Sequence, residues 1–521
     1  MAVAATNISA AHGETRVEEI VVTADRREQN IQKVPISVSA ITAAAAEAQG
    51  VVDLTSIATA IPSLSTSRSS TSNSVFLRGV GAPAPEIANE PSVATYVDDI
   101  YIPFGGGTLF DFNNIERVEV LKGPQGTLFG RNATGGVIHV FTRNPSATPS
   151  LDANAGIASY DTWSANFYGT TGLSDNVAVN LALHAQERNK GWGTNVRTGG
   201  ESHIGRDYAG RAKLMWTPTD PNSVQLAASM DRQKGTLGTA RAPVPGTLVT
   251  NAPGGPVGNV GFYNTNLTVD PNYTSNSQTY SAKIKQDLGF ANLTSISAYS
   301  VFNYNQIYDL DVSPANGQLV DIAAFNNMTT QEIQLQSKSD SRVRWIVGGF
   351  YLRNYAGFDP QLILTPTSLQ RIDSKITSES LSGFGQATVE LFPGTNLTAG
   401  LRYTRDHREA IGGTTVNRVT TLQSRQAKSW KKASWRISLD HQFTPDLMVF
   451  AGVNTGFKSG VYNPSSYSLA AVNPEAITAY ETGVKSQWLD NRLRINGSVF
   501  YYDYKNLQVT VVNPAGGSSF T

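Results

Sequence analysis

The amino-acid sequence predicts a transmembrane antiparallel β-barrel preceded by a compact α+β unit. Three observations support this fold class. About fifteen stretches of alternating apolar and polar residues fill the chain from Leu151 to Tyr504. Short turns and long polar loops separate these stretches, and no apolar run reaches the roughly 18 residues that a membrane helix needs.

The alternation gives each predicted strand one apolar and one polar face, because successive side chains of a strand point to opposite sides. In the segment 177–188, the odd-numbered residues up to Leu183 are apolar, whereas Asn180, His184 and Gln186 share the polar face. The segments 397–404 and 493–502 follow the same pattern.

Loop lengths distinguish a membrane barrel from a soluble β-sandwich, which shows the same alternation. Short turns at one rim and long loops at the other are typical of outer-membrane barrels. We expect short turns at 174–176, 218–222, 288–291, 338–342, 392–395, 444–446 and 489–491, and long polar loops at 234–275, 309–325 and 412–430. Aromatic residues near the strand ends fit an interfacial belt; they are Trp216, Tyr299, Trp345, Trp435 and Trp488.

Seven short turns join fourteen strands, and one further strand near 154–159 gives fifteen. A closed single-chain bacterial barrel has an even strand number, and an open edge in lipid leaves backbone groups unpaired. The final residues 513–521 are expected to form a loop. The sequence therefore predicts a partial barrel whose C-terminal strands are missing.

Composition argues against several classes of function. Charged residues make up 16% of the 521 residues, below the roughly 25% of soluble domains, and the net charge of zero gives no support for nucleic-acid binding. The chain has no cysteine, and its six histidines are scattered outside any metal-ligand or catalytic motif. We therefore expect neither an enzyme, nor a metal site, nor a covalently bound cofactor.

The N-terminus lacks a signal peptide, but the small, polar residues 4–13 are similar to the end of one, which suggests a late start codon or a removed leader.

Residues before about 149 do not show the barrel pattern and predict a compact α+β unit. We expect strands at 35–41, 75–77 and 93–101, and short helices at 43–48 and 54–60. A glycine-rich run, IERVEVLKGPQGTLFGRNATGGVI, then extends from Ile115 to Ile138.

This run resembles the end of the plug domain of TonB-dependent outer-membrane receptors of the siderophore-receptor type. The segments 75–79 (VFLRG), 96–99 (YVDD) and 480–485 (YETGVK) are similar to other signatures of the family. The resemblance implies a barrel of about 22 strands with the plug in its lumen, in the outer membrane of a Gram-negative bacterium, in contact with lipid and lipopolysaccharide. It divides the chain into a tail (1–30), a plug (31–149) and a partial barrel (150–521).

The plug glycines are expected to allow tight turns and close backbone approach in a confined lumen. They flank Arg131 and are Gly123, Gly126, Gly130, Gly135 and Gly136. No Walker A spacing is present, so phosphate binding is not expected.

A segment near the N-terminus is similar to the TonB box of the family. It is extended and β-prone, so it suits strand addition to a partner's sheet edge. Its residues are Glu19, Ile20, Val21, Val22, Thr23 and Ala24. The resemblance implies that TonB is the partner at the periplasmic side.

Plug and barrel are expected to share polar contacts. Arg78 and Lys122 align with basic plug residues that pair with barrel carboxylates in relatives, and Glu390 and Glu481 are the matching candidates because their strand parity faces them to the lumen. A lumen-facing carboxylate that is simply solvated is the alternative.

The small-molecule ligand is expected to bind the plug tips 82–90 and 102–107 and the loops 189–205, 234–275 and 309–324. Aromatic residues there predict a binding floor and are Phe104, Trp192, Tyr263 and Tyr308. The resemblance favours a ferric siderophore, a ferric chelate carried whole. Cobalamin, haem, nickel complexes and oligosaccharides remain alternatives, as does a passive porin.

Overall fold

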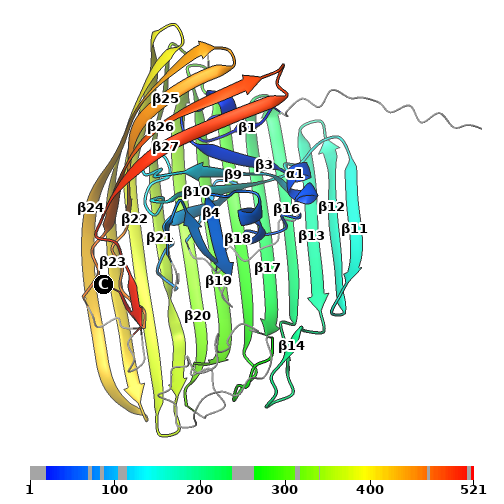
Figure 1. Ribbon diagram of the computed structural model, residues 1–521, viewed down its shortest axis with the longest axis vertical. Coiled ribbons are helices and arrows are strands. Elements are labelled where there is room, and N and C mark those ends of the chain that lie inside the picture. Colours follow the sequence, from blue (N-terminus) through cyan, green and yellow to red (C-terminus); the bar gives the residue numbers. More distant parts are fainter. Residues whose placement is uncertain are drawn as a thin grey trace, which may run out of the picture.

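The computed structural model describes residues 19–68, 73–82, 87–103, 114–236, 263–310, 317–339, 341–465, 470–512 and 518–520. It contains a large curved antiparallel sheet and an N-terminal unit (residues 19–142) on the concave side of that sheet (Figure 1). We call the concave side of the sheet the inner wall.

The large sheet has fifteen strands, and each pairs antiparallel with the next. Fifteen strands were expected, and this prediction is confirmed. β11 and β27 stand at the two ends of the strand order. The strands are β11 (Ser150–Ala158), β12 (Thr162–Ser174), β13 (Val177–Arg188), β16 (Gly205–Thr219), β17 (Asn222–Thr236), β18 (Asn272–Asp287), β19 (Ala291–Asp309), β20 (Leu319–Ser337), β21 (Val343–Leu364), β22 (Leu369–Phe392), β23 (Thr395–Val416), β24 (Val419–Thr444), β25 (Leu447–Lys458), β26 (Glu475–Trp488) and β27 (Leu493–Lys505).

All seven predicted short turns join the expected strand pairs at one rim of the sheet. The predicted loop 412–430 is wrong, because β23 and β24 continue through it and meet at the turn Asn417–Arg418, where both residues have positive φ. The predicted loop 309–325 is shorter than expected, because β20 already starts at Leu319. In both cases backbone pairing continues although the side chains are polar, since ladder hydrogen bonds do not require an apolar face.

Some short connections fold into small sheets of their own. β14 (Gly193–Thr194) pairs with β15 (Glu201–Ser202), and β28 (Thr510–Val512) pairs with β29 (Ser518–Phe520). The expectation of a loop at 513–521 is therefore wrong for 518–520. No helix among the described residues combines the length and the apolar character that crossing a membrane requires.

The N-terminal unit is built on a five-stranded sheet in the order β3-β9-β10-β7-β8, in which only β10 and β7 are parallel. The strands are β3 (Val38–Thr42), β7 (Val93–Val97), β8 (Ile100–Ile102), β9 (Ile115–Lys122) and β10 (Gly136–Thr142). The predicted single strand 93–101 is wrong. Asp98 and Asp99 adopt positive φ, so the chain reverses there into the β7–β8 hairpin.

The remaining elements of the unit pack around this sheet. The predicted helix 43–48 is α1 (Ala43–Ala48), capped by the Thr42 hydroxyl, and the predicted helix 54–60 is the shorter 3-10 helix η2 (Ser56–Thr59). β4 (Leu64–Arg68), β5 (Asn73–Leu77) and β6 (Val80–Gly81) form a second sheet, while β1 (Val21–Val22), β2 (Gln29–Asn30) and η1 (Ile31–Lys33) lie at the start.

Two apolar clusters hold the unit. One joins α1 and η2 to the five-stranded sheet around Leu54, Ile57 and Val120. The other runs from Val22 through Phe129 to inner-wall residues of β20–β22 such as Met328, Ile346 and Phe384. The second cluster fixes the N-terminal unit against the large sheet.

Candidate functional site

The segment 19–24 is folded onto the N-terminal unit. Val21 and Val22 pair with Asn30 and Gln29, and the Val22 side chain is fully buried. The Thr23 backbone N–H donates to Glu119 Oε2 at 2.9 Å. The β-prone segment predicted from the sequence is extended, but its central residues are docked.

The three residues that follow this segment each contact the inner wall. Asp25 Oδ1 lies 2.8 Å from Arg436 Nη1. The Arg26 guanidinium lies 3.5 Å from Glu332 Oε1 and 4.2 Å from the centre of the Phe129 ring. Arg27 donates to backbone oxygens of β20 and β21, at 2.9 Å and 2.7 Å. These anchors were not predicted from the sequence, although the consecutive charges Asp25-Arg26-Arg27 are a visible signal.

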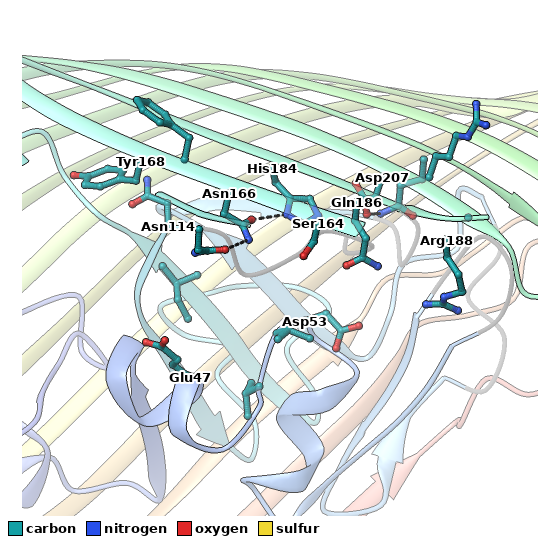
Figure 2. Close-up of a pocket in the computed structure, with 18 of the residues that line it drawn as sticks. Glu47, Asp53, Asn114, Ser164, Asn166, Tyr168, His184, Gln186, Arg188 and Asp207 are labelled. Carbon is teal, nitrogen blue, oxygen red and sulfur yellow. Dashed lines mark hydrogen bonds between the residues drawn. The ribbon is translucent and has the colours of Figure 1, made fainter. Parts of the chain in front are cut away.

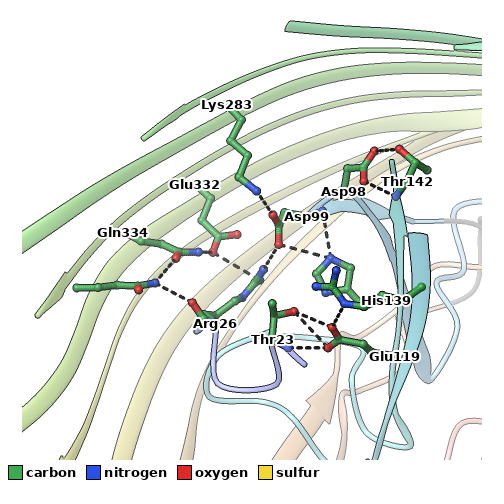
Figure 3. A network of polar contacts seen from close by, with 12 residues as sticks. Thr23, Arg26, Asp98, Asp99, Glu119, His139, Thr142, Lys283, Glu332 and Gln334 are labelled. Atoms are coloured by element: carbon green, nitrogen blue, oxygen red, sulfur yellow. Dashed lines mark hydrogen bonds and ion pairs between the residues drawn. The ribbon is translucent and has the colours of Figure 1, made fainter. Parts of the chain in front are cut away.

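The β7–β8 turn is the centre of a buried polar network (Figure 3). Asp99 contacts Arg26 at 3.2 Å and Lys283 of β18 at 2.5 Å, and its backbone N–H donates to His139 Nε2 at 3.2 Å. Burial alone would raise the pKa of Asp99, but Lys283, His139 and Arg26 hold it far below its usual value. Burial lowers the pKa of His139 to about 3, so this histidine is a neutral acceptor.

The neighbouring Asp98 fixes the same turn to β16. Its carboxylate accepts from the Thr142 N–H at 2.9 Å and lies 3.0 Å from Lys213 Nζ. Burial raises the pKa of Asp98, but Lys213, Arg211 and the hydrogen bonds from Thr142 together hold the pKa below its usual range. The predicted motif 96–99 thus supplies two barrel contacts.

Arg78 and Glu481 are brought together, with Arg78 Nη2 2.8 Å from Glu481 Oε1 and both side chains buried. Arg78 also lies over the Phe500 ring at 4.1 Å. Lys122 lies beside this pair, and burial together with the charge of Arg78 lowers the pKa of Lys122.

Glu390 does not take part in these contacts, and its predicted pairing with the N-terminal unit is wrong. Its side chain is exposed and accepts from the Gly394 N–H at 2.9 Å in the short β22–β23 turn. The pairing register breaks between Glu390 and Phe392, so this carboxylate lies at the rim.

The glycine-rich run makes close backbone contacts. A Cβ on Gly136 would lie 2.2 Å from the Leu121 oxygen, at a φ of +146°. A Cβ on Gly126 would lie 2.5 Å from the Thr455 oxygen of β25. Gly123 and Gly130 have positive φ, and a Cβ on Gly135 would lie 2.9 Å from a β6 oxygen. A side chain at Gly126 would therefore block close approach to β25, and side chains at Gly135 and Gly136 would block packing against β6 and β9 within the unit.

A second buried charge cluster joins the N-terminal unit to β23. Glu90 contacts Arg131 at 2.5 Å and also Arg408 of β23, and Arg131 lies 3.4 Å from Asp406. Burial raises the pKa of Glu90, but the two guanidinium groups hold it below its usual value. The sequence analysis predicted Arg131 as a turn residue and missed its ion pairs, because its barrel partner is 275 residues away.

A polar cavity of about 1200 Å³ lies between α1 and the inner wall of β11–β13 and β16–β18. Figure 2 shows Glu47 and Asp53 facing Asn166, His184 and Gln186 across it. The cavity thus lies between α1 and this part of the large sheet.

The aromatic residues predicted as a binding floor are not shown to form one surface, although Tyr263 lies in a segment that adjoins Gly193, next to Trp192. The Trp192 ring stacks on His203 at 4.3 Å and faces the Arg188 guanidinium at 4.7 Å. Tyr308 packs against an apolar cluster on the inner wall, and Tyr263 is exposed. Phe104 lies outside the described residues. The described residues contain no group of three His, Asp or Glu side chains suited to a metal ion.

Comparisons with known proteins match this architecture. Residues 229–521 match the family profile described as TonB dependent receptor-like, beta-barrel, and residues 30–137 match TonB-dependent Receptor Plug Domain. The pesticin receptor of Yersinia pestis is 25% identical over 449 residues, which cover 84% of this chain. The chain spans only about 63% of the length of that relative.

Solved structures show the same fold. The ferric yersiniabactin uptake receptor FyuA from Yersinia pestis matches with a TM-score of 0.80 and 21% identity, over 91% of this chain and 73% of that one. The ferric-catecholate import receptor Fiu from E. coli, in its open form, matches with a TM-score of 0.69 and 17% identity, over 92% of this chain and 76% of that one.

Proposed function

Because the chain belongs to the TonB-dependent receptor family, we propose that it is an outer-membrane receptor that imports a ferric siderophore, with TonB supplying work from the periplasmic side. The family consists of receptors and transporters and not of enzymes. A large ligand requires a wide barrel, and a wide barrel is an open pore unless its lumen is filled.

One observation carries the proposal: the N-terminal unit lies on the concave side of the sheet, and its first strand is followed beside the short-turn rim by three consecutive residues that contact the inner wall. The segment 19–24 is followed directly by Asp25, Arg26 and Arg27, each bound to a different part of the inner wall. A partner that takes up segment 19–24 as an added strand would first have to release the β1–β2 pairing and the Thr23–Glu119 contact, and a pull on the freed segment would then reach these anchors.

The ferric-chelate part of the proposal is supported by relatives. They include an uptake receptor for ferric yersiniabactin and an import receptor for ferric catecholates. A chelate carried whole keeps its iron fully coordinated, so the receptor needs no metal ligands of its own.

A substitution at Ile20 tests the proposed partner contact. Ile20→Pro removes the backbone N–H that strand addition would use and keeps the carbonyl that accepts from the Ile31 N–H. We expect unchanged binding and at least a tenfold loss of TonB-dependent uptake, measured with iron-55 on a panel of siderophores in cells that lack other receptors. Ile20→Val is the matched control and should transport normally.

Uptake by the Ile20→Pro variant at the parental rate would refute the proposal. A conductance measurement distinguishes the proposed receptor from a passive porin. The full chain in a planar bilayer should stay closed without TonB, whereas a porin would conduct constantly.

A further inference from the structure

Arg402 of β23 is a buried cation that no carboxylate holds. The residue is 4% exposed, its Nε has no hydrogen-bond partner, and it forms no ion pair with an acidic side chain among the described residues. The buried arginines Arg26, Arg131, Arg408 and Arg436 differ, because each contacts a carboxylate. A buried charge without such a partner is destabilising. Arg402 therefore stands to gain from any carboxylate that becomes free beside it.

Aromatic rings and a glycine enclose the Arg402 guanidinium instead. Its Cζ lies 5.0 Å from the centre of the Phe384 ring on β22 and 5.5 Å from the centre of the Phe350 ring on β21. A Cβ on Gly130 of the N-terminal unit would lie 2.8 Å from the same Cζ. Ring faces attract a cation, but they do not replace the oxygen acceptors that the N–H groups of an arginine prefer.

The carboxylate that Arg402 is placed to reach is Glu332 of β20. Phe350, whose ring the guanidinium already contacts, pairs directly with Glu332 in the strand register. Side chains paired in this way lie about 5 Å apart at their Cβ atoms. Of the surrounding charges, Glu332 favours the Arg402 cation most, whereas Arg26 opposes it. The two arginines therefore compete for one carboxylate.

Arg26 holds that carboxylate while the segment 19–24 is docked. Its guanidinium lies 3.5 Å from Glu332 Oε1, and the Gln334 amide is the other contact of the carboxylate. Removal of Arg26 would leave the buried Glu332 without a cation in contact and would end the repulsion between the two arginines. Departure of Arg26 thus supplies the free carboxylate that Arg402 lacks.

The other carboxylate near Arg402 does not become free in the same way. Asp406 also attracts Arg402, but Arg131 of the glycine-rich run lies 3.4 Å from Asp406 Oδ1. Arg131 lies more than a hundred residues after the segment 19–24 in the sequence, and it is held by Glu90 as well. A pull on that segment therefore reaches the partner of Glu332 before it reaches the partner of Asp406.

Resting on the proposed function, we propose that Arg402 is a positioning residue for import: when Arg26 is drawn out, the Arg402 guanidinium turns from the two phenylalanine rings to Glu332 and takes the place of Arg26. The exchange keeps the carboxylate paired during release of the N-terminal segment. It also opposes the return of Arg26, because redocking has to displace Arg402 from Glu332, so the released segment stays available for longer.

A thiol-labelling cycle on the full chain tests the proposal. The chain has no cysteine, and Ile31 is buried and follows Arg26 in the sequence, so Ile31→Cys reports opening of the stretch that contains Arg26. When closing is faster than labelling, the maleimide rate is proportional to the open population. Arg402→Met should lower this rate at least about fivefold, because the open state loses its charge-assisted pair. In a chain that already carries Glu332→Gln, Arg402→Met should change the rate less than about twofold.

The sign of the effect and the cycle separate the proposal from two other roles. An arginine that only clamps Gly130 to the inner wall would stabilise the docked state, so Arg402→Met would raise the labelling rate. An arginine that only repels Arg26 would give the same decrease with or without the Glu332 carboxylate. Either result would overturn the inference.

Two further variants are matched controls. Arg402→Lys keeps the positive charge and should label within about threefold of the parent; a rate as low as that of Arg402→Met would overturn the inference. Arg402→Gln removes the charge but keeps a polar side chain. It should repeat the decrease and its dependence on Glu332, which keeps the test decisive where the methionine variant fails to fold.

The outcomes also separate this inference from the proposed function, because the labelling cycle needs neither TonB nor a ligand. Labelling of Arg402→Met at the parental rate would overturn the inference and leave the import function standing. Absence of TonB-dependent uptake for every iron-55 chelate would overturn the import function, and the labelling cycle would still decide whether Arg402 takes over Glu332.

Discussion

Replacing Arg26 by methionine should release the segment 19–24 from its docked position. Arg26 lies 3.2 Å from Asp99 and 3.5 Å from Glu332, and both carboxylates are largely buried. After the substitution Asp99 keeps Lys283 as its partner at 2.5 Å. Glu332 keeps the neutral amide of Gln334 and the longer-range attraction of the buried Arg402. The change therefore removes the only ion pair within 4 Å that Glu332 makes among the described residues.

The magnitude follows from that unpaired charge. Breaking a buried ion pair from one side costs about 3–5 kcal/mol. Undocking the segment lets water reach Glu332. The free-energy cost of the unpaired charge therefore destabilises only the docked state. Each 1.4 kcal/mol is a factor of ten, so about 3 kcal/mol increases the population of the undocked segment by about 100-fold.

Thiol labelling measures this population. The chain has no cysteine, so Val22→Cys places a single thiol at a fully buried position. The rate of its reaction with a maleimide reports opening, and Arg26→Met should raise that rate about 100-fold. Adding Glu332→Gln should restore much of the protection, because a buried amide is less costly than a buried carboxylate.

The matched control is Arg371→Met. Arg371 pairs with Asp373 on the exposed part of β22, with side chains 48% and 38% exposed, and such pairs contribute little. Its labelling rate should stay within threefold of the parent. The reasoning is refuted if Arg26→Met labels at the parental rate, or if Glu332→Gln restores no protection.

Three further predictions concern the N-terminal unit. Gly136→Ala places a Cβ 2.2 Å from a backbone oxygen of β9 and should destabilise the unit by about 3 kcal/mol or more, measured as faster trypsin cleavage; parental resistance would contradict it. Glu481→Gln weakens the buried pair with Arg78 and should lower the urea midpoint for release of the unit, whereas Glu390→Gln should not. His139 has a folded pKa of about 3, below the unfolded value of about 6.5. Its contribution to stability is therefore complete above that unfolded value and falls by about 2 kcal/mol at pH 5. The urea midpoint of the His139→Gln variant should therefore change less between pH 7 and pH 5 than the parent's midpoint does. An equal change in both proteins would contradict the lowered pKa of His139.

The strands and short turns could be predicted because their signals are local. Alternation of side chains along 177–188 and the turn residues at 174–176 depend only on neighbouring residues. The same local logic failed at 412–430, where polar residues predicted a loop. There, strand pairing between β23 and β24 continues regardless of polarity. It failed again at Asp98 and Asp99, where the chain reverses within a segment that has strong strand propensity.

The charge pairs could not be predicted with equal success, because they join residues hundreds of positions apart. Strand parity placed both Glu390 and Glu481 on the lumen side, and only the height of each residue along its strand separates them. Glu481 lies level with Arg78, whereas Glu390 lies at the rim. The partners of Asp99 and Glu90 depend on the rotation and depth of the N-terminal unit within the sheet, which no local pattern specifies.

The sequence by itself thus determined the fold class, the strand count, the glycine-rich run and the extended segment 19–24, because each depends on side-chain periodicity or on backbone freedom over short stretches. Only the tertiary structure decided which charges meet and that segment 19–24 is docked. These features arise from the packing of one folded unit against another, where the burial of a group and the distance to its partner control its energy.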